Sequence, residues 1–208
     1  MSGGPIARLT GAVLVGATRL LVGGHARWQG CAPEPRQRIY FANHASHLDT
    51  VILWSALPPS LRRTTHPVAA RDYWDRDPLR RHVARDVLGA VLVERRARRD
   101  PLGPCRAALA AGGSLILFPE GTRCGGAEPG AFKGGLHHLA REFPVVELVP
   151  VHLDNLSRAF PKGAILPAPI VCSATFGAPL GFDPAEPKHA FLERARSAVC
   201  ALGRRIAT

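Results

Sequence analysis

Short apolar runs alternate along this chain with longer segments suited to helices. Apolar runs of strand length occupy residues 38–42, 67–70, 90–93, 114–118, 145–153 and 170–176. Helical segments are expected over residues 48–57, 78–88, 101–112, 133–143 and 185–206. Two of them open with Asp-Pro, a cap followed by a proline at the first helical position. The alternation predicts an α/β fold, with a mixed, largely parallel sheet flanked by helices.

The N-terminal segment differs from the rest. Residues 5–24 are mostly apolar but carry Arg8 and Arg19, and the uncharged stretch between them falls short of the roughly 18 residues that a spanning helix needs. A signal peptide and a helix packed on the domain are alternatives, although no clear small-x-small cleavage site follows. We expect residues 1–30 to form an amphipathic segment at a membrane interface, and residues 31–208 to form the main domain.

The charge of the chain indicates an anionic partner. Lys and Arg total 27 against 16 Asp and Glu, which gives a net charge of +11 and a pI near 10.6. Nucleic acid, an anionic membrane and phosphorylated substrates all fit this charge. The low aromatic content of 6% and the lack of a recognition motif argue against a nucleic-acid-binding module. Five widely spaced cysteines without a CxxC pair predict reduced thiols inside a cell.

The segment ANHASHLD, residues 42–49, places several polar side chains directly after the first predicted strand. Ser46 and Asp49 have the spacing of a capping box, which is a purely structural explanation for these two residues. It does not explain Asn43, His44 and His47 together. Asp49 lies one helical turn beyond the loop and can reach His44, and an imidazole held by a carboxylate is a competent general base. His47 is a second candidate base, but the spacing to Asp49 favours His44.

Two further segments bring polar residues to the ends of predicted strands. In LILFPEGTR, residues 115–123, Gly121 permits a tight turn at which the backbone can approach a ligand. Arg123 offers a planar guanidinium suited to phosphate. In GAVLVERRARR, residues 89–99, the strand brings Arg95 to its end in the same way. Taken alone, each segment is also explained as an ordinary strand exit with solvated charges.

Together these segments resemble the glycerolipid acyltransferase family, whose best-known members are the lysophosphatidate acyltransferases. The family has a His and an Asp separated by four residues, a Gly before an apolar strand that ends in Arg, the string FPEGTR, and an apolar run containing Pro. The four blocks lie, in the family's order, at His44 to Asp49, Gly89 to Arg95, Phe118 to Arg123 and Leu148 to Val151. The third block matches letter for letter, although Cys124 follows it where the family often has Ser.

The resemblance implies transfer of a fatty acyl group from acyl-CoA or acyl carrier protein to the free hydroxyl of 1-acylglycerol-3-phosphate, forming phosphatidic acid. His44 would be the general base and Asp49 would orient it. The acyl thioester is a co-substrate, and the chemistry needs no further cofactor and no metal. The residues expected to bind the acceptor are Arg95, Glu120, Gly121, Thr122, Arg123 and Lys133.

The motifs leave several alternatives open. The acceptor can instead be another lysolipid, namely a lysophospholipid, a lyso-aminolipid or a glycolipid. A thioesterase would use the same His–Asp pair to activate water. The adjacent His137 and His138 point in different directions on a helix, so they do not indicate a metal site. We expect peripheral or monotopic attachment to the cytoplasmic face of a membrane that contains anionic lipids.

Overall fold

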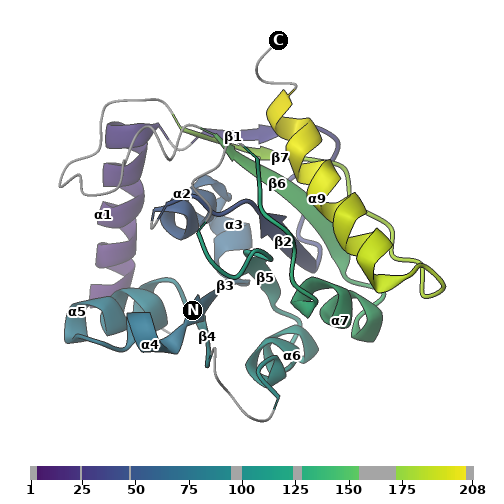
Figure 1. Ribbon diagram of the computed structural model, residues 1–208. Helices are drawn as coiled ribbons and strands as arrows, with labels where there is room; N and C mark the ends of the chain where they lie inside the picture. Colours follow the sequence, from purple (N-terminus) through teal and green to yellow (C-terminus); the bar gives the residue numbers. More distant parts are fainter. Residues whose placement is uncertain are drawn as a thin grey trace.

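The computed structural model describes residues 4–23, 25–46, 48–94, 100–123, 128–154 and 172–204. Within these residues the strands form one sheet in the order β1-β7-β6-β2-β5-β3-β4 (Figure 1). The strands are β1 (His25–Trp28), β2 (Arg38–Ala42), β3 (Thr65–Ala70), β4 (Val91–Val93), β5 (Ser114–Leu117), β6 (Glu147–Asp154) and β7 (Ser173–Phe176). Only the β6–β7 pair is antiparallel among these strands. The predicted mixed, largely parallel sheet is therefore confirmed.

Helices cover both faces of this sheet. They are α1 (Pro5–Val22), α2 (Asp49–Ala56), α3 (Pro59–Arg62), α4 (Arg71–Trp74), α5 (Pro78–Arg81), the π-helix η1 (His82–Val87), α6 (Gly103–Ala110), α7 (Gly135–Glu142) and α9 (Lys188–Arg204). One apolar cluster lies between the sheet and α1, α2 and η1, and a second lies between the sheet and α6, α7 and α9. Figure 1 shows α1 at one side of the molecule and α9 at the other.

The central strand β2 serves both clusters because successive side chains of a strand point to opposite faces. Tyr40 and Ala42 belong to the cluster under α1 and α2, and Ile39 and Phe41 belong to the cluster under α6, α7 and α9. Every residue of β2 is buried. A strand that is covered on both faces is typically a nearly continuous apolar run, and this run allowed β2 to be predicted from the sequence.

Several local features differ from the sequence-based expectations, among them the short helices α3 and α4, which were not predicted. Strand β1 was not predicted, because its sequence HARW has no apolar run; it lies at the sheet edge beside β7, within the segment assigned to residues 1–30. The helix expected over residues 78–88 is a short α5 followed by the π-helix η1, with Asp77 capping it through Arg80 N–H as expected. The next helix begins at Gly103 and not at residue 101.

The predicted site residues all follow strands that end at the same edge of the sheet. Strands β2, β5, β3 and β4 are parallel neighbours, so their carboxyl ends meet at the same edge. In open α/β sheets, ligands bind at this edge. The segments after β2, β4 and β5 are the three that carry the predicted site residues. Among the described residues, no helix is long and apolar enough to cross a membrane.

Candidate active site

The His44–Asp49 pair forms as the sequence predicts. His44 follows the end of β2 and Asp49 is the first residue of α2, and His44 Nδ1 lies 2.8 Å from Asp49 Oδ2. Asp49 is fully buried, whereas the His44 side chain is 20% exposed. The second ring nitrogen, Nε2, has no hydrogen-bond partner among the described residues, and the ring lines a pocket. The pair thus presents one imidazole nitrogen to a ligand.

One carboxylate oxygen of Asp49 contacts three successive residues of the loop between β2 and α2. In addition to the imidazole, Oδ2 accepts hydrogen bonds from the backbone N–H groups of Ala45 (2.6 Å) and Ser46 (2.9 Å). Because Oδ2 already accepts from two amides, its contact with His44 requires the proton to be on Nδ1, which leaves a lone pair on Nε2. The capping box is half formed: the Asp49 carboxylate accepts from the N–H of Ser46, but the Ser46 hydroxyl accepts from the N–H of Leu48 and from no amide of α2 itself.

Two neighbours fix the position of the loop. The Asn43 side chain donates to the carbonyl of Leu153 in β6 and accepts from the N–H of the same residue, at 3.0 and 2.8 Å. The His44 ring stacks on Phe118, with 4.4 Å between ring centroids and 24° between planes. The sequence singled out Asn43 without explaining it, and it offered no signal for the stacking role of Phe118 beyond its place in FPEGTR.

The pocket next to His44 has a volume of about 360 Å³. Its walls come from the carboxyl ends of β3, β4 and β5, which contribute the apolar residues Val68, Val93 and Leu117. The exposed charged residues of its lining have both signs: Arg76 and Arg123, and Asp72 and Glu94. A cavity with apolar residues in its walls and charged residues of both signs in its lining can accept an amphiphile that has an alkyl chain and a polar head.

Glu120 occupies a different position from the one expected of an acceptor ligand. It is 3% exposed and does not line the pocket. Its Oε1 accepts from the backbone N–H of His44 at 2.7 Å, and its Oε2 accepts from the N–H of Gly130 at 2.9 Å. Both oxygens are therefore engaged by the backbone, and the contacts give Glu120 the role of holding two loops together.

The rest of the FPEGTR segment divides between pocket and surface. Gly121 and Arg123 line the pocket, whereas Thr122 is exposed and lies outside the lining. Gly121 has a φ of +66°, and a Cβ there would lie 2.7 Å from Lys133 Nζ. The left-handed backbone conformation favours glycine at this turn, and a larger residue would also have to displace the flexible end of the Lys133 side chain.

Only some of the predicted site residues lie together at the pocket in the part of the chain that the structure describes. His44, Asp49, Gly121 and Arg123 lie in or directly behind the pocket. The predicted phosphate ligand Arg95, the alternative base His47 and Cys124 lie outside the described residues.

Among the cysteines that the structure describes, thiol chemistry has little support. Burial raises the pKa of the Cys105 and Cys172 thiols to about 11, and it also raises the pKa of Cys31 and Cys200. A thiol with a raised pKa is a poor nucleophile near neutral pH. Within the part of the chain that the structure describes, no three His, Cys, Asp or Glu side chains gather closely enough to hold a metal ion.

Comparison with known proteins gives three findings. The family model described as Acyltransferase matches residues 29–154. A curated 1-acyl-sn-glycerol-3-phosphate acyltransferase of Chlamydomonas reinhardtii is 31% identical over 136 residues, which cover 63% of this chain and 38% of that protein. The chain therefore spans well under two thirds of this relative's length. The crystal structure of the 1-acyl-sn-glycerophosphate (LPA) acyltransferase PlsC from Thermotoga maritima matches with a TM-score of 0.72 and 21% identity, covering 98% of this chain and 80% of that one.

Proposed function

The chain belongs to the Acyltransferase family, and we propose that it transfers a fatty acyl group from an acyl thioester to the free hydroxyl of 1-acylglycerol-3-phosphate. The product would be phosphatidic acid, and the donor would be acyl-CoA or acyl-ACP. The observation that carries the proposal is the His44–Asp49 pair at 2.8 Å, with the imidazole at the wall of a partly apolar pocket. The names of the two relatives support the choice of acceptor.

The proposed reaction uses the two ring nitrogens of His44 differently. Nδ1–H is held by Asp49, so Nε2 takes the proton of the acceptor hydroxyl as that oxygen attacks the thioester carbonyl. The buried Asp49 carboxylate stabilises the imidazolium that forms. When the tetrahedral intermediate collapses, the carbon–sulfur bond breaks and the imidazolium gives its proton to the leaving thiolate. The histidine is thereby returned to its starting state, and no covalent acyl-enzyme is needed.

Transfer to a panel of lysolipids tests the proposal. Purified protein in detergent would receive a labelled long-chain acyl-CoA, or the matching acyl-ACP, together with 1-acylglycerol-3-phosphate, lysophosphatidylcholine, a lyso-aminolipid or a lysoglycolipid. Formation of phosphatidate as the main product supports the proposed acceptor. A different acylated product would keep the mechanism and replace the acceptor, and the absence of any acylated lipid would refute the function.

Arg76 and Arg123 are the described cations that line the pocket, and we propose that Arg123, two residues after Gly121, binds the acceptor phosphate. Replacing Arg123 with Met should raise KM for 1-acylglycerol-3-phosphate by about ten- to a hundredfold, the value of a hydrogen bond to a charged group. KM for the thioester should change little. Arg123→Lys keeps the charge without the planar fork and should recover part of the loss. If steady-state kinetics show that only the donor KM rises, Arg123 does not bind the acceptor.

We also propose that α1 lies on a membrane surface. Its outer face presents a stripe of Ile6, Leu9, Val13 and Leu20, which are 62–86% exposed, whereas Ala7 and Val15 on the opposite face are buried in the core. An exposed apolar stripe on a helix, on a chain with a net charge of +11, provides the two weak signals that peripheral attachment requires.

Replacing Ile6, Leu9 and Val13 together with Ser should weaken binding to vesicles that contain anionic lipid by at least about tenfold, because the buried apolar area is lost. Co-sedimentation with the vesicles measures this binding. Val145→Ser is the control, because Val145 is even more exposed, at 88%, but lies between α7 and β6, away from the stripe. Equal binding of the triple variant and the wild type would contradict the proposed attachment.

A further inference from the structure

Glu120 joins two segments that lie far apart in the sequence. It follows β5, and its carboxylate accepts from His44 N–H on one side and from Gly130 N–H on the other. No ion pair to this buried carboxylate forms within the described residues. A buried carboxylate depends on its hydrogen-bond donors, so the position of Glu120 depends on the orientation of these two peptide groups.

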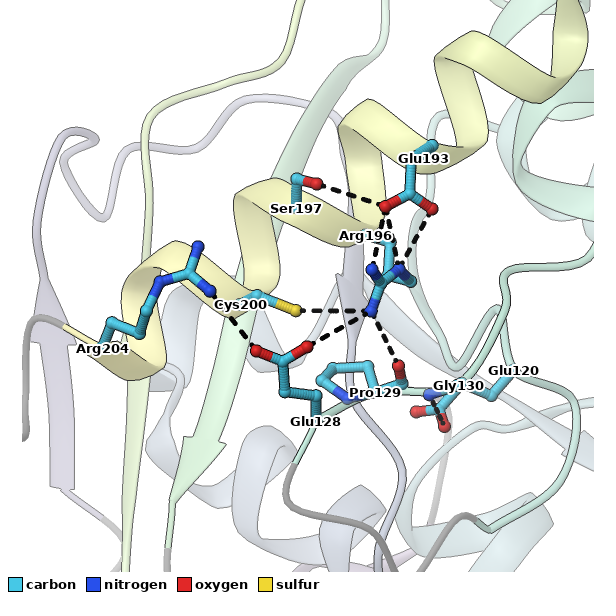
Figure 2. A network of polar contacts seen from close by, with 9 residues as sticks. All are labelled: Glu120, Glu128, Pro129, Gly130, Glu193, Arg196, Ser197, Cys200 and Arg204. Carbon is cyan, nitrogen blue, oxygen red and sulfur yellow. Dashed lines mark hydrogen bonds and ion pairs between the residues drawn. The ribbon is translucent and has the colours of Figure 1, made fainter.

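The peptide group between Pro129 and Gly130 is held from both sides. Its N–H donates to Glu120 Oε2 at 2.9 Å, and its carbonyl accepts from Arg196 Nη1 at 3.2 Å. A trans peptide is planar, and its C=O and N–H groups point in opposite directions. Arg196 and Glu120 therefore bind opposite sides of the same planar peptide group, as Figure 2 shows.

Arg196 is itself held in place for this contact. It lies on α9, where Glu193 binds the Nε and Nη2 atoms of its guanidinium at 2.9–3.2 Å. This fork leaves Nη1 directed at the Pro129 carbonyl, with Glu128 Oε2 at 3.7 Å on the same side (Figure 2). The side chain is only 25% exposed, so solvent screens these contacts incompletely.

We propose that Arg196 is a positioning residue for the reaction proposed above. It orients the Pro129–Gly130 peptide, that peptide holds Glu120, and Glu120 holds the backbone of His44. The cation on the carbonyl also polarises the peptide group, which makes its N–H a stronger donor to the Glu120 carboxylate. Arg196 touches neither the pocket nor His44, and no motif of the family resemblance contains it. The effect on turnover rests on the proposed function, whereas the effect on the backbone does not.

Arg196→Met keeps the aliphatic stem and removes the guanidinium. It should lower kcat by about tenfold or more, because small displacements of a catalytic group are costly, and leave KM for both substrates little changed. Hydrogen–deuterium exchange of the full chain should show about tenfold faster exchange at the amides of His44 and Gly130. Arg196→Lys keeps the charge but cannot form the same fork, so it should recover part of both losses.

Arg194→Met is the matched control. Arg194 also lies on α9 and forms an equivalent ion pair with Glu186, but it donates to the carbonyl of Gly181, away from this peptide. It should leave kcat and both amides unchanged. The inference is overturned if Arg196→Met behaves like wild type, or if both variants lose activity and thermal stability equally. If the wild type acylates no acceptor, the proposed function fails, and the exchange at His44 and Gly130 still decides whether Arg196 positions them.

Discussion

Replacing His44 with Ala should lower kcat by about 10²- to 10⁴-fold, the range over which a positioned general base accelerates a reaction. Its Nε2 is the ring nitrogen available at the pocket wall, because Nδ1 is engaged by Asp49 at 2.8 Å. Without it, the acceptor hydroxyl must lose its proton to water. Acyl transfer from a labelled thioester to 1-acylglycerol-3-phosphate, at saturating substrate, measures the effect.

His44→Asn separates the chemical role of this residue from its structural role. The asparagine amide can take the place of Nδ1–H and donate to Asp49, but it has no basic nitrogen. It should therefore be as inactive as the alanine variant while remaining folded, although it loses the stacking on Phe118. His47→Ala should retain activity, because spacing favours His44 as the base. Activity in a folded His44→Asn protein, or its loss in His47→Ala alone, would assign the base elsewhere.

Asp49→Asn should also lower kcat by about 10²- to 10⁴-fold, although the loop keeps its shape. All three contacts of Asp49 converge on Oδ2, and Oδ1 has no hydrogen-bond partner among the described residues. An asparagine with its carbonyl oxygen at the Oδ2 position keeps these three contacts. What it loses is the negative charge that stabilises the imidazolium, so the variant isolates the electrostatic contribution.

The chain provides a matched control for this variant. His82 and Asp86 form a second His–Asp contact of 2.8 Å between Nδ1 and Oδ2, on the surface of η1. Asp86→Asn should leave kcat unchanged.

Asp49→Asn should also lower thermal stability. Its amide group is a buried donor without an acceptor, which should lower the free energy of unfolding by about 1–3 kcal/mol. A kcat close to wild type for a folded Asp49→Asn protein would show that the charge of Asp49 is not used.

The features that the sequence predicted correctly are local ones. His44 and Asp49 are five residues apart, so their contact depends only on where β2 ends and α2 begins. Both boundaries could be predicted from the sequence. An apolar run marks the end of β2, and polar residues followed by a second apolar run mark the start of α2. Likewise, Gly121 was identified as a turn glycine, and its positive φ bears this out.

The features that the sequence did not reveal depend on the order of the strands. The pocket walls come from β3, β4 and β5. No local sequence pattern predicts that these strands are neighbours in the sheet or that β5 pairs with β2. Arg196 is hidden for the same reason. It contacts a carbonyl 67 residues earlier in the chain, and in the sequence it looks like any exposed cation of an amphipathic helix. Glu120 was recognised as part of a motif, but its role as a link between two loops required the structure.

The most direct test of the proposed function compares thioester consumed with phosphatidate formed. Wild-type protein would receive a labelled acyl thioester with and without 1-acylglycerol-3-phosphate, and both free fatty acid and phosphatidate would be quantified. We predict that thioester loss requires the acceptor and matches phosphatidate formation mole for mole. Release of free fatty acid at the same rate without the acceptor, with no acylated lipid formed, would show that the His44–Asp49 pair activates water and would contradict the proposed transfer.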